Sequence, residues 1–336
     1  MTAAETVVLI EQHATPRSCA SLLRCGRYAV RVRHVPRCGS EPPVVVREAT
    51  VKVIDQAGLV PPPSEDPADE VRQALAAEAA APDARHTVIV HARSPARAVG
   101  DLLAESGRLN VLSRDSACFA KDLLVTIEKL AGGDIFGLEK YLCFGSHVVE
   151  LELRHTDDKY MALDRLLAHA AGLGLGTRAQ ALATAADELI LNAFFHAPVD
   201  AGGARPHAHL PRTTPLCSPP DRPVVVRYGS DGVCFGLSVS DGHGSLGSAR
   251  IAQIMTSQLR ARRRAIDLSH TSNELGLTAI AESVTHLVFN IEAGRRTEII
   301  ALVELAGPPR RARGRSINVF SRPLAAPEQA GKPVAG

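Results

Sequence analysis

The stretch that most constrains the fold is Ala186–Ala197, ADELILNAFFHA. Its apolar residues recur every three or four positions, which predicts a helix with one buried stripe. The stripe consists of Leu182, Ala186, Leu189 and Ala193. Glu188, Asn192 and His196 follow one another at intervals of four and share a different face of the same helix. A carboxylate, an amide and an imidazole on one face form either a solvated surface or one wall of a site, and these residues alone leave both interpretations open.

A second motif, Asp241-Gly242-His243-Gly244, directly follows the alternating run Val233–Val239, so it lies where a predicted strand ends and a loop begins. Gly242 and Gly244 allow the backbone to approach a ligand closely. Asp241 is suited to accept a hydrogen bond from an amino group such as the exocyclic nitrogen of adenine. Alone, this motif is also ordinary turn chemistry. Paired with the preceding helix, it is more specific.

Together the two motifs resemble the ATPase fold shared by histidine kinases, the Hsp90 chaperone, DNA gyrase and mismatch-repair proteins (the GHKL type). Within that fold, the likeness is to the anti-sigma-factor serine kinases, whose helix carries Glu, Asn, His and a small residue as Glu188, Asn192, His196 and Ala197 do here. The resemblance covers residues 148–305. It implies an α/β sandwich.

Two further stretches carry the resemblance. Gly276, Leu277 and Thr278 resemble the second glycine box, and Thr297 resembles the threonine on a late strand that helps to hold adenine. The sequence departs from the family at Glu274, where the family usually has another glycine. A carboxylate at this position would repel the phosphates that the loop is meant to cover.

The resemblance implies that ATP and Mg²⁺ bind here. Asn192 would coordinate Mg²⁺, Glu188 would accept a proton from the attacking hydroxyl or water, and Asp241 would select adenine. His196 would either contact phosphate or lock the helix against its neighbour. The implied phosphate acceptor is a serine or threonine on a small antagonist protein, and the implied partners are a sigma factor or antagonist-like protein and a second copy of the chain.

Composition sets broad limits. The 336 residues are enough for two domains, and 45% hydrophobic with 22% charged residues is ordinary for a globular protein. No apolar run approaches the roughly 18 residues of a membrane span, and Met1–Thr6 has no signal-peptide pattern. We therefore expect a cytoplasmic protein without membrane contact. The net charge of +2 gives no reason to expect direct binding to nucleic acid.

Residues 7–130 alternate between predicted strands and helices, as a parallel, doubly wound sheet does. The predicted strands are 7–10, 28–35, 44–46, 51–54, 87–91 and 109–112, and the predicted helices are 16–25, 69–80, 96–106 and 117–130. The size and order of these elements resemble the receiver domain of two-component response regulators.

The chemistry of a receiver is mostly missing. Receivers have an acidic pair after the first strand, a phosphorylated Asp after the third, and a Lys after the fifth. Here the first strand ends in Glu11-Gln12, and Ser113-Arg114 follow the strand 109–112, which corresponds to the fifth strand of a receiver. Asp55 is the one sensible candidate for phosphorylation, but it lacks the metal-binding acids that would activate it. We therefore expect a degenerate receiver-like domain that serves interaction or dimerisation.

These predictions divide the chain into four parts: a degenerate receiver-like domain at 1–130, a linker at 131–147, the ATPase domain at 148–306 and a disordered basic tail at 307–336. Within the ATPase domain, the Pro- and Gly-rich residues 198–223 are expected to form a flexible insertion.

Three functions remain open from the sequence. The first is an anti-sigma-type serine/threonine kinase that uses Mg²⁺·ATP. The second is a nucleotide-binding signalling adaptor without phosphate transfer, which Glu274 and the degenerate receiver favour. The third is a histidine kinase. It is disfavoured because His155-Thr156-Asp157 falls in a strand-to-helix turn rather than in a helical hairpin.

Overall fold

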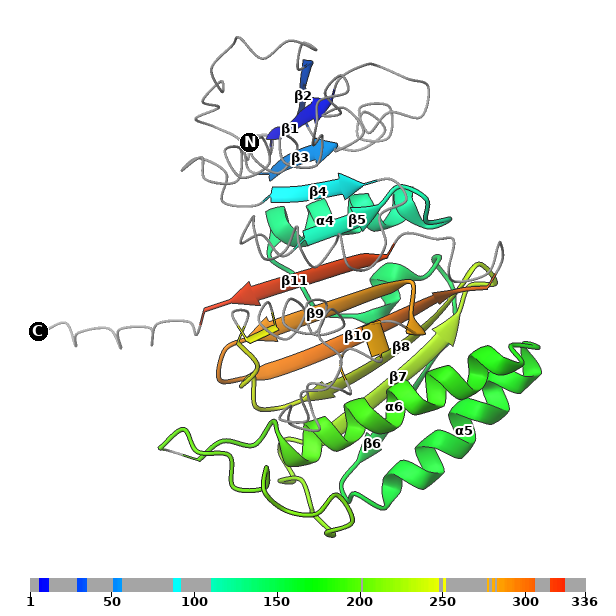
Figure 1. Cartoon of the computed structure of the whole chain (residues 1–336), viewed down its shortest axis with the longest axis vertical. Helices are drawn as coiled ribbons and strands as arrows, with labels where there is room; N and C mark the ends of the chain where they lie inside the picture. The colour runs from blue at the N-terminus through cyan, green and yellow to red at the C-terminus, as the bar shows by residue number, and fades with distance from the viewer. Residues whose placement is uncertain are drawn as a thin grey trace, which may run out of the picture.

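The computed structural model describes part of the chain, and all structural statements concern that part. The described residues are 6–11, 29–34, 51–55, 87–91, 110–200, 202–247, 250–251, 277, 280–281, 283–305 and 315–323. They form a mixed α/β structure, as predicted, in which strands from both ends of the chain join one sheet. The order of its strands is β2-β1-β3-β4-β5-β11-β9-β10-β8-β7-β6 (Figure 1).

The N-terminal half of the sheet is parallel, which confirms the parallel pairing predicted from the alternating pattern. It contains β1 (Thr6–Glu11), β2 (Ala29–His34), β3 (Val51–Asp55), β4 (Thr87–His91) and β5 (Asn110–Ser113). Their order, 2-1-3-4-5, is one of the two common doubly wound orders. The predicted strand at 44–46 and the predicted helices at 16–25, 69–80 and 96–106 lie outside the described residues.

The C-terminal half is mostly antiparallel. It contains β6 (Val148–Leu153), β7 (Val224–Ser230), β8 (Cys234–Asp241), β9 (His286–Glu292) and β10 (Arg296–Glu304). The β9–β10 hairpin turns through Gly294 as predicted, with a positive φ of 71° that favours glycine. β7 has no counterpart among the predicted strands, although it pairs with both β6 and β8.

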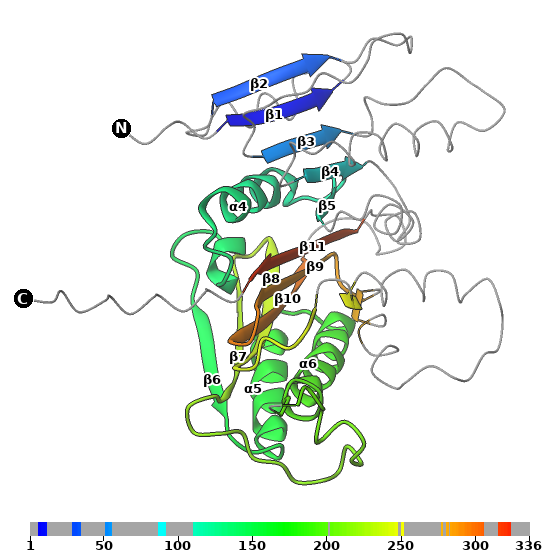
Figure 2. The same cartoon turned by 90° about the vertical axis from the view of Figure 1, so that its left-hand side faces the viewer.

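The last described strand corrects a prediction. Ser316–Arg322, in the expected disordered tail, forms β11, which pairs parallel with β9 and antiparallel with β5. Ile317 and Val319 are buried on one face of the sheet and Phe320 on the other. The expected disorder is therefore wrong for these residues, because their alternating apolar side chains fill the seam between the two halves of the sheet. Figure 2 shows β11 below the N-terminal strands and above the C-terminal ones.

Helices cover opposite faces of the C-terminal half. α5 (Asp158–Gly172) and α6 (Thr177–Phe195) pack side by side on one face (Figures 1 and 2). α4 (Phe119–Gly132) and the short 3₁₀ helix η2 (Leu138–Tyr141) pack on the other. Alternation along β10 shows the division, because Ile299, Ala301 and Val303 belong to the core under α5 and α6, whereas Ile300 and Leu302 belong to the core under α4.

α4 also connects the two halves. Its stripe of Phe119, Leu123 and Ile127 packs against strands β3, β4 and β5. Residues 131–147, the predicted linker, pack into the same core, since η2 inserts the fully buried Tyr141. This stretch therefore connects the two halves through buried apolar side chains.

Candidate functional site

α6 presents two of the predicted site residues one turn apart. Glu188 and Asn192 are both partly exposed, and each has one buried side-chain oxygen without a hydrogen-bond partner in the described structure. These atoms are Glu188 Oε2 and Asn192 Oδ1. Buried oxygens are normally hydrogen-bonded, because leaving one unsatisfied costs about 1–3 kcal/mol. The two side chains therefore have unused acceptor capacity on one face of the helix.

The other oxygen of Glu188 is held by an arginine. Arg212 Nη1 donates to Glu188 Oε1 at 2.7 Å. Arg212 belongs to residues 198–223, the predicted flexible insertion, which is attached to the rest of the protein at several points. Leu216 exchanges hydrogen bonds with Thr156, at 3.0 and 3.1 Å. The described residues of this segment are therefore attached to α6 and to the turn before α5, which differs from the expected flexible insertion.

His196 ends α6. Its backbone N–H donates to Asn192 O at 2.9 Å, and its carbonyl oxygen accepts from Arg205 Nη1. The same guanidinium donates to Ser245 O at 3.1 Å, so Arg205 joins the end of α6 to the loop after β8. Burial, with the nearby Arg212 and Arg205, lowers the pKa of His196 to about 4. The imidazole is thus neutral near pH 7 and is suited to hydrogen bonding rather than to acting as a cation.

Asp241 and Thr297 lie on the strands of the same half of the sheet. They are paired directly in the β8–β10 register, and each alternates onto the face that α6 covers, as Val239 and Ile299 do. Thr297 Oγ1 is buried, and the Thr297 hydroxyl is close enough to the Asp241 carboxyl group to oppose the rise that burial causes in its pKa.

The Asp241 carboxyl group is held mainly by backbone amides. Asp241 Oδ1 accepts from the N–H groups of His243, at 2.8 Å, and Gly244, at 3.3 Å. Burial nevertheless raises the pKa of Asp241 to about 6. A carboxylate whose charge is incompletely compensated is suited to a ligand that donates a hydrogen bond.

The two glycines of this motif have structural reasons that need no ligand. A Cβ on Gly242 would meet Arg222 Cβ at 2.7 Å. A Cβ on Gly244 would lie 2.1 Å from Glu292 O, and Gly244 has a positive φ of 59°. Both glycines thus permit close packing of protein against protein, and their contact with a ligand remains a prediction.

The second glycine box is described in part. Leu277 is buried in the core on the α6 face. Gly276, Thr278 and Glu274 lie outside the described residues. The structure therefore brings Glu188, Asn192, Asp241 and Thr297 to one face of the sheet, together with Leu277 and the end of α6 at His196.

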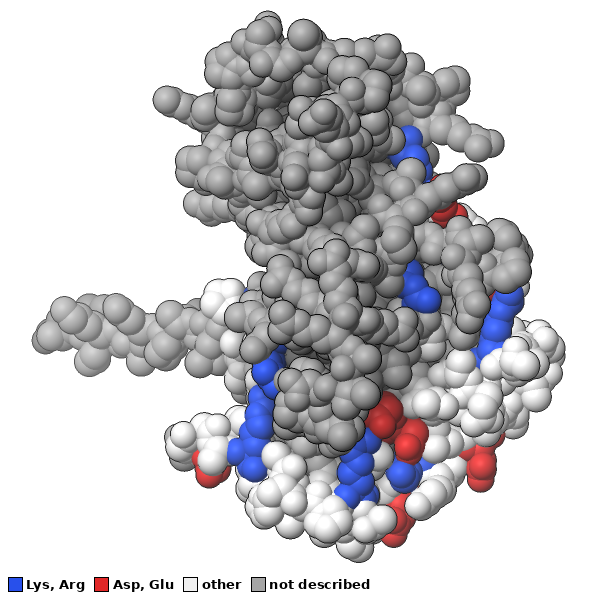
Figure 3. All heavy atoms as spheres, in the orientation of Figure 1, with Lys and Arg blue, Asp and Glu red and all other residues white. Residues whose placement is uncertain are grey.

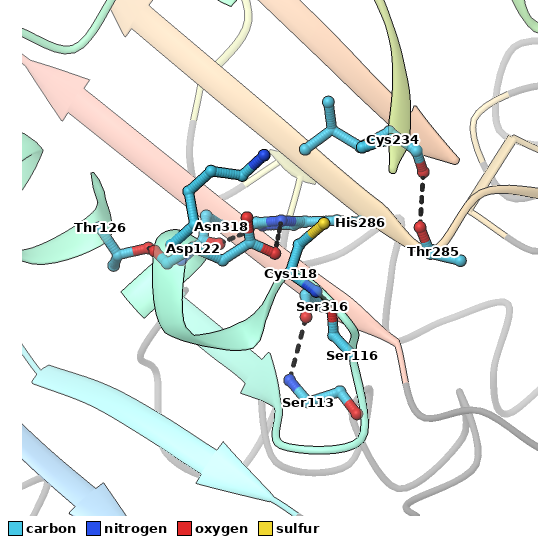
Figure 4. Close-up of polar contacts among 12 residues, drawn as sticks. Ser113, Ser116, Cys118, Asp122, Thr126, Cys234, Thr285, His286, Ser316 and Asn318 are labelled. Atoms are coloured by element: carbon cyan, nitrogen blue, oxygen red, sulfur yellow. Dashed lines mark hydrogen bonds and ion pairs between the residues drawn. The ribbon is translucent and has the colours of Figure 1, made fainter. Parts of the chain in front are cut away.

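A second polar cluster, which the sequence reasoning missed, lies on the opposite face (Figure 4). His286 stands between Asp122 and Asn318, with Nδ1 3.1 Å from Asp122 Oδ2 and Nε2 2.5 Å from Asn318 Oδ1. Asn318 Nδ2 in turn donates to Asn110 Oδ1 at 3.0 Å. These contacts link α4, β9, β11 and β5. In the sequence, this cluster could have been found from the polar residues at inward-facing positions of otherwise apolar strands.

The cluster continues under β10. Lys129 Nζ donates to Asn290 Oδ1 at 3.2 Å, and Asn290 Nδ2 donates to Glu298 Oε2 at 2.9 Å. Burial lowers the pKa of Lys129 to about 7, although Glu298 works in the opposite direction. Glu298 follows Thr297 in β10, so adjacent residues serve the two faces of the sheet.

The receiver-like positions occupy the C-terminal ends of parallel strands. Glu11, Asp55, His91 and Ser113 are the last residues of β1, β3, β4 and β5. The backbone N–H of Ser113 donates to Ser316 Oγ at 3.0 Å, so β11 contacts the end of β5.

Comparison with protein-family models finds no match, and comparison with curated protein sequences finds none either. Among the described residues, no helix combines the length and apolar character needed to cross a bilayer. The same residues contain no group of three or more His, Cys, Asp or Glu side chains arranged to hold a metal ion. On the face drawn in Figure 3, the described basic and acidic side chains are interspersed over the C-terminal half.

Proposed function

We propose that residues 148–305 bind Mg²⁺·ATP on the α6 face of the sheet and transfer the γ-phosphoryl group to a serine or threonine of a partner protein, in the manner of an anti-sigma-type kinase. The partner in this proposal is a sigma factor or an antagonist-like protein, and the chain pairs with a second copy of itself.

The observation that carries the proposal is that residues of the sequence motif have buried polar atoms without a hydrogen-bond partner. Glu188 and Asn192, each matched to the ATPase family by sequence alone, have a buried oxygen without a partner in the described structure. Such oxygens also occur in the cluster on the α4 face, at Asp122 and Glu298. The α6 face differs because its unsatisfied atoms fall on the residues of the motif.

Each residue has a role that its chemistry allows. Asn192 Oδ1 is an oxygen ligand of the kind that Mg²⁺ prefers, and bound Mg²⁺ would neutralise phosphate charge. Glu188 Oε2 has the free lone pairs that a general base needs. Asp241, with Thr297 beside it in the register, is suited to accept a hydrogen bond from the amino group of adenine.

For the N-terminal half, we propose a degenerate receiver-like module that makes protein contacts and takes no phosphate. The 2-1-3-4-5 order of parallel strands supports a receiver-like architecture. The strand ends support the loss of phosphotransfer, since Glu11 ends β1 and Ser113 ends β5 where a receiver needs an acidic pair and a lysine.

The test compares Glu188→Ala with Asn192→Ala in the full chain. Titration calorimetry measures the affinity for ATP with and without Mg²⁺, and phosphate release measures turnover. We expect Glu188→Ala to retain Mg²⁺·ATP affinity and to lose roughly 100- to 10,000-fold in turnover, as is typical when a general base is removed. Asn192→Ala should weaken affinity only when Mg²⁺ is present, because its oxygen contacts the metal.

Asp187→Ala serves as the matched control, since Asp187 precedes Glu188 on α6 but pairs with Lys159, at 2.8 Å, on α5. Asp187→Ala should change neither the affinity for Mg²⁺·ATP nor the turnover by more than about threefold. Binding without turnover in the wild-type protein would assign the nucleotide-binding adaptor instead of the kinase. Failure of the wild-type protein to bind Mg²⁺·ATP would exclude both the kinase and the adaptor.

A further inference from the structure

The folded segment 198–223 places an arginine on the carboxylate proposed as the general base. Resting on the proposed function, we propose that Arg212 is a positioning residue for Glu188. It fixes Oε1 so that Oε2 remains directed at the attacking hydroxyl or water. This assigns the segment a part in catalysis that its composition does not suggest.

The two oxygens of the Glu188 carboxylate have different surroundings. One carboxylate oxygen receives a charge-assisted hydrogen bond from Arg212 at 2.7 Å, and the other is buried without a partner in the described structure. The two side chains are 30% and 24% exposed, so water competes only in part for the pair. Without Arg212, a glutamate side chain has three rotatable bonds with which to turn its free oxygen away. The ion pair removes much of that freedom while leaving one oxygen able to accept a proton.

Contacts on both sides of Arg212 hold the segment that carries it. On its N-terminal side, Arg205 bonds to the carbonyl oxygens of His196 and Ser245. On its C-terminal side, Ser218 N–H donates to Arg154 O at 2.8 Å, next to the paired Leu216. Ordering a free loop would cost about 1–2 kcal/mol per residue. Because these anchors already order the segment, little of that cost falls on the Arg212–Glu188 contact.

The charges near Arg212 indicate which end of the site it occupies. Burial, Arg212 and Arg205 together lower the pKa of His196, so the two guanidinium groups lie near the end of α6. This cationic end suits the phosphates of the nucleotide, whereas Asp241 suits its base.

The reaction balances with Arg212 outside the bond changes. Glu188 Oε2 accepts the proton of the attacking hydroxyl or water as the new oxygen–phosphorus bond forms. The bond from the γ-phosphorus to the bridging oxygen breaks, and ADP leaves with its electron pair. Arg212 touches none of the reacting atoms in this scheme and acts through Glu188.

The experiment measures phosphate release from Mg²⁺·ATP, with water as acceptor, and the affinity for a non-hydrolysable ATP analogue with Mg²⁺. The full-length variants are Arg212→Gln, Arg212→Lys and the control Arg227→Gln. Arg227 on β7 also pairs with a glutamate, Glu150, but it alternates onto the face away from α6, since its neighbours Val226 and Tyr228 belong to the α6-face core. We expect Arg212→Gln to lower kcat by roughly 10- to 100-fold while affinity changes by less than about threefold. Arg212→Lys should recover part of kcat, and Arg227→Gln should resemble the wild type.

Other results overturn the proposal in identifiable ways. Weakened affinity with unchanged kcat would make Arg212 a phosphate contact, and no change in either quantity would make the ion pair a surface contact only. Wild-type binding without turnover would remove the positioning role and leave nucleotide binding, whereas absent binding would remove the proposed function itself. If Arg212→Gln does not fold, as judged by circular dichroism, Arg212→Lys decides by the same split between kcat and affinity.

Discussion

Replacing Asp241 with asparagine should stabilise the nucleotide-free protein while weakening its affinity for adenine nucleotides. Burial raises the pKa of Asp241 from an ordinary 3.8 to about 6, so its ionised form destabilises the folded state at neutral pH. A rise of about 2 units corresponds to about 3 kcal/mol. Because the side chain is partly exposed, we expect Asp241→Asn to raise the free energy of unfolding by about 1–3 kcal/mol at neutral pH.

The pH dependence has a definite sign. The folded pKa lies above the unfolded one, so between about pH 4 and about pH 6 the folded state binds more protons than the unfolded state. Wild-type protein therefore gains stability from this group as the pH falls through that window, and the asparagine variant does not. The advantage of Asp241→Asn should be full above about pH 6 and small near pH 4.

Urea unfolding of both proteins across this pH range measures the effect, and titration calorimetry with ADP measures the functional cost. Loss of a charged hydrogen bond to adenine, worth about 1.5–3 kcal/mol, should weaken affinity by at least about tenfold. A variant that is less stable than the wild type at neutral pH would refute the buried-charge argument. Unchanged ADP affinity would refute the adenine contact.

Asp231, which precedes the same strand, provides a control of opposite sign. Burial disfavours its ionised form, but hydrogen bonds from Lys121 and from the amides of Cys234 and Val233 outweigh burial and hold its pKa well below the ordinary range. Asp231→Asn should therefore destabilise the protein at neutral pH by about 1–3 kcal/mol. This contribution is present above about pH 4 and is lost at lower pH, so the difference should shrink on acidification.

Two further predictions concern the other parts of the chain. The N-terminal half should take no phosphate from acetyl phosphate; a phosphoryl adduct in intact-mass spectrometry that Asp55→Ala removes would contradict this. Gly244→Ala should lower the free energy of unfolding by roughly 2–4 kcal/mol, because its Cβ would meet Glu292 O at 2.1 Å at a positive φ. Gly247→Ala, whose Cβ meets nothing within 4 Å, should change stability by less than about 1 kcal/mol in the same denaturation assay, and equal losses in both variants would contradict the packing argument.

Local patterns in the sequence predict much of the secondary structure. Period-two alternation locates β6 and the β9–β10 hairpin, and the period of 3.6 locates α6, because these signals arise from neighbouring residues that share one face. The same logic predicts that Glu188 and Asn192 lie on one side of a helix. Their binding of Mg²⁺·ATP stays a prediction.

Tertiary structure decided the features that depend on residues distant in sequence. In the sequence, β11 resembles part of a polar tail because it has few apolar residues. Those residues are buried only because the fold places β11 between β5 and β9. The segment carrying Arg212 looks like a flexible loop because its composition is rich in Pro and Gly. Its order depends on Thr156 and on the end of α6, which local periodicity does not encode.

The buried cluster of Lys129, His286 and Glu298 also depends partly on the local sequence and partly on the tertiary structure. The sequence determined that polar residues interrupt apolar strands. Without its distant partner, each of these residues would be a buried polar group with an uncompensated desolvation cost. Only the fold brings α4 against β9, β10 and β11, so that Asp122 meets His286 and Asn290 lies between Lys129 and Glu298. Hydrogen bonding between distant strands and helices compensates much of that desolvation, and pairing of this kind is a property of topology rather than of local sequence.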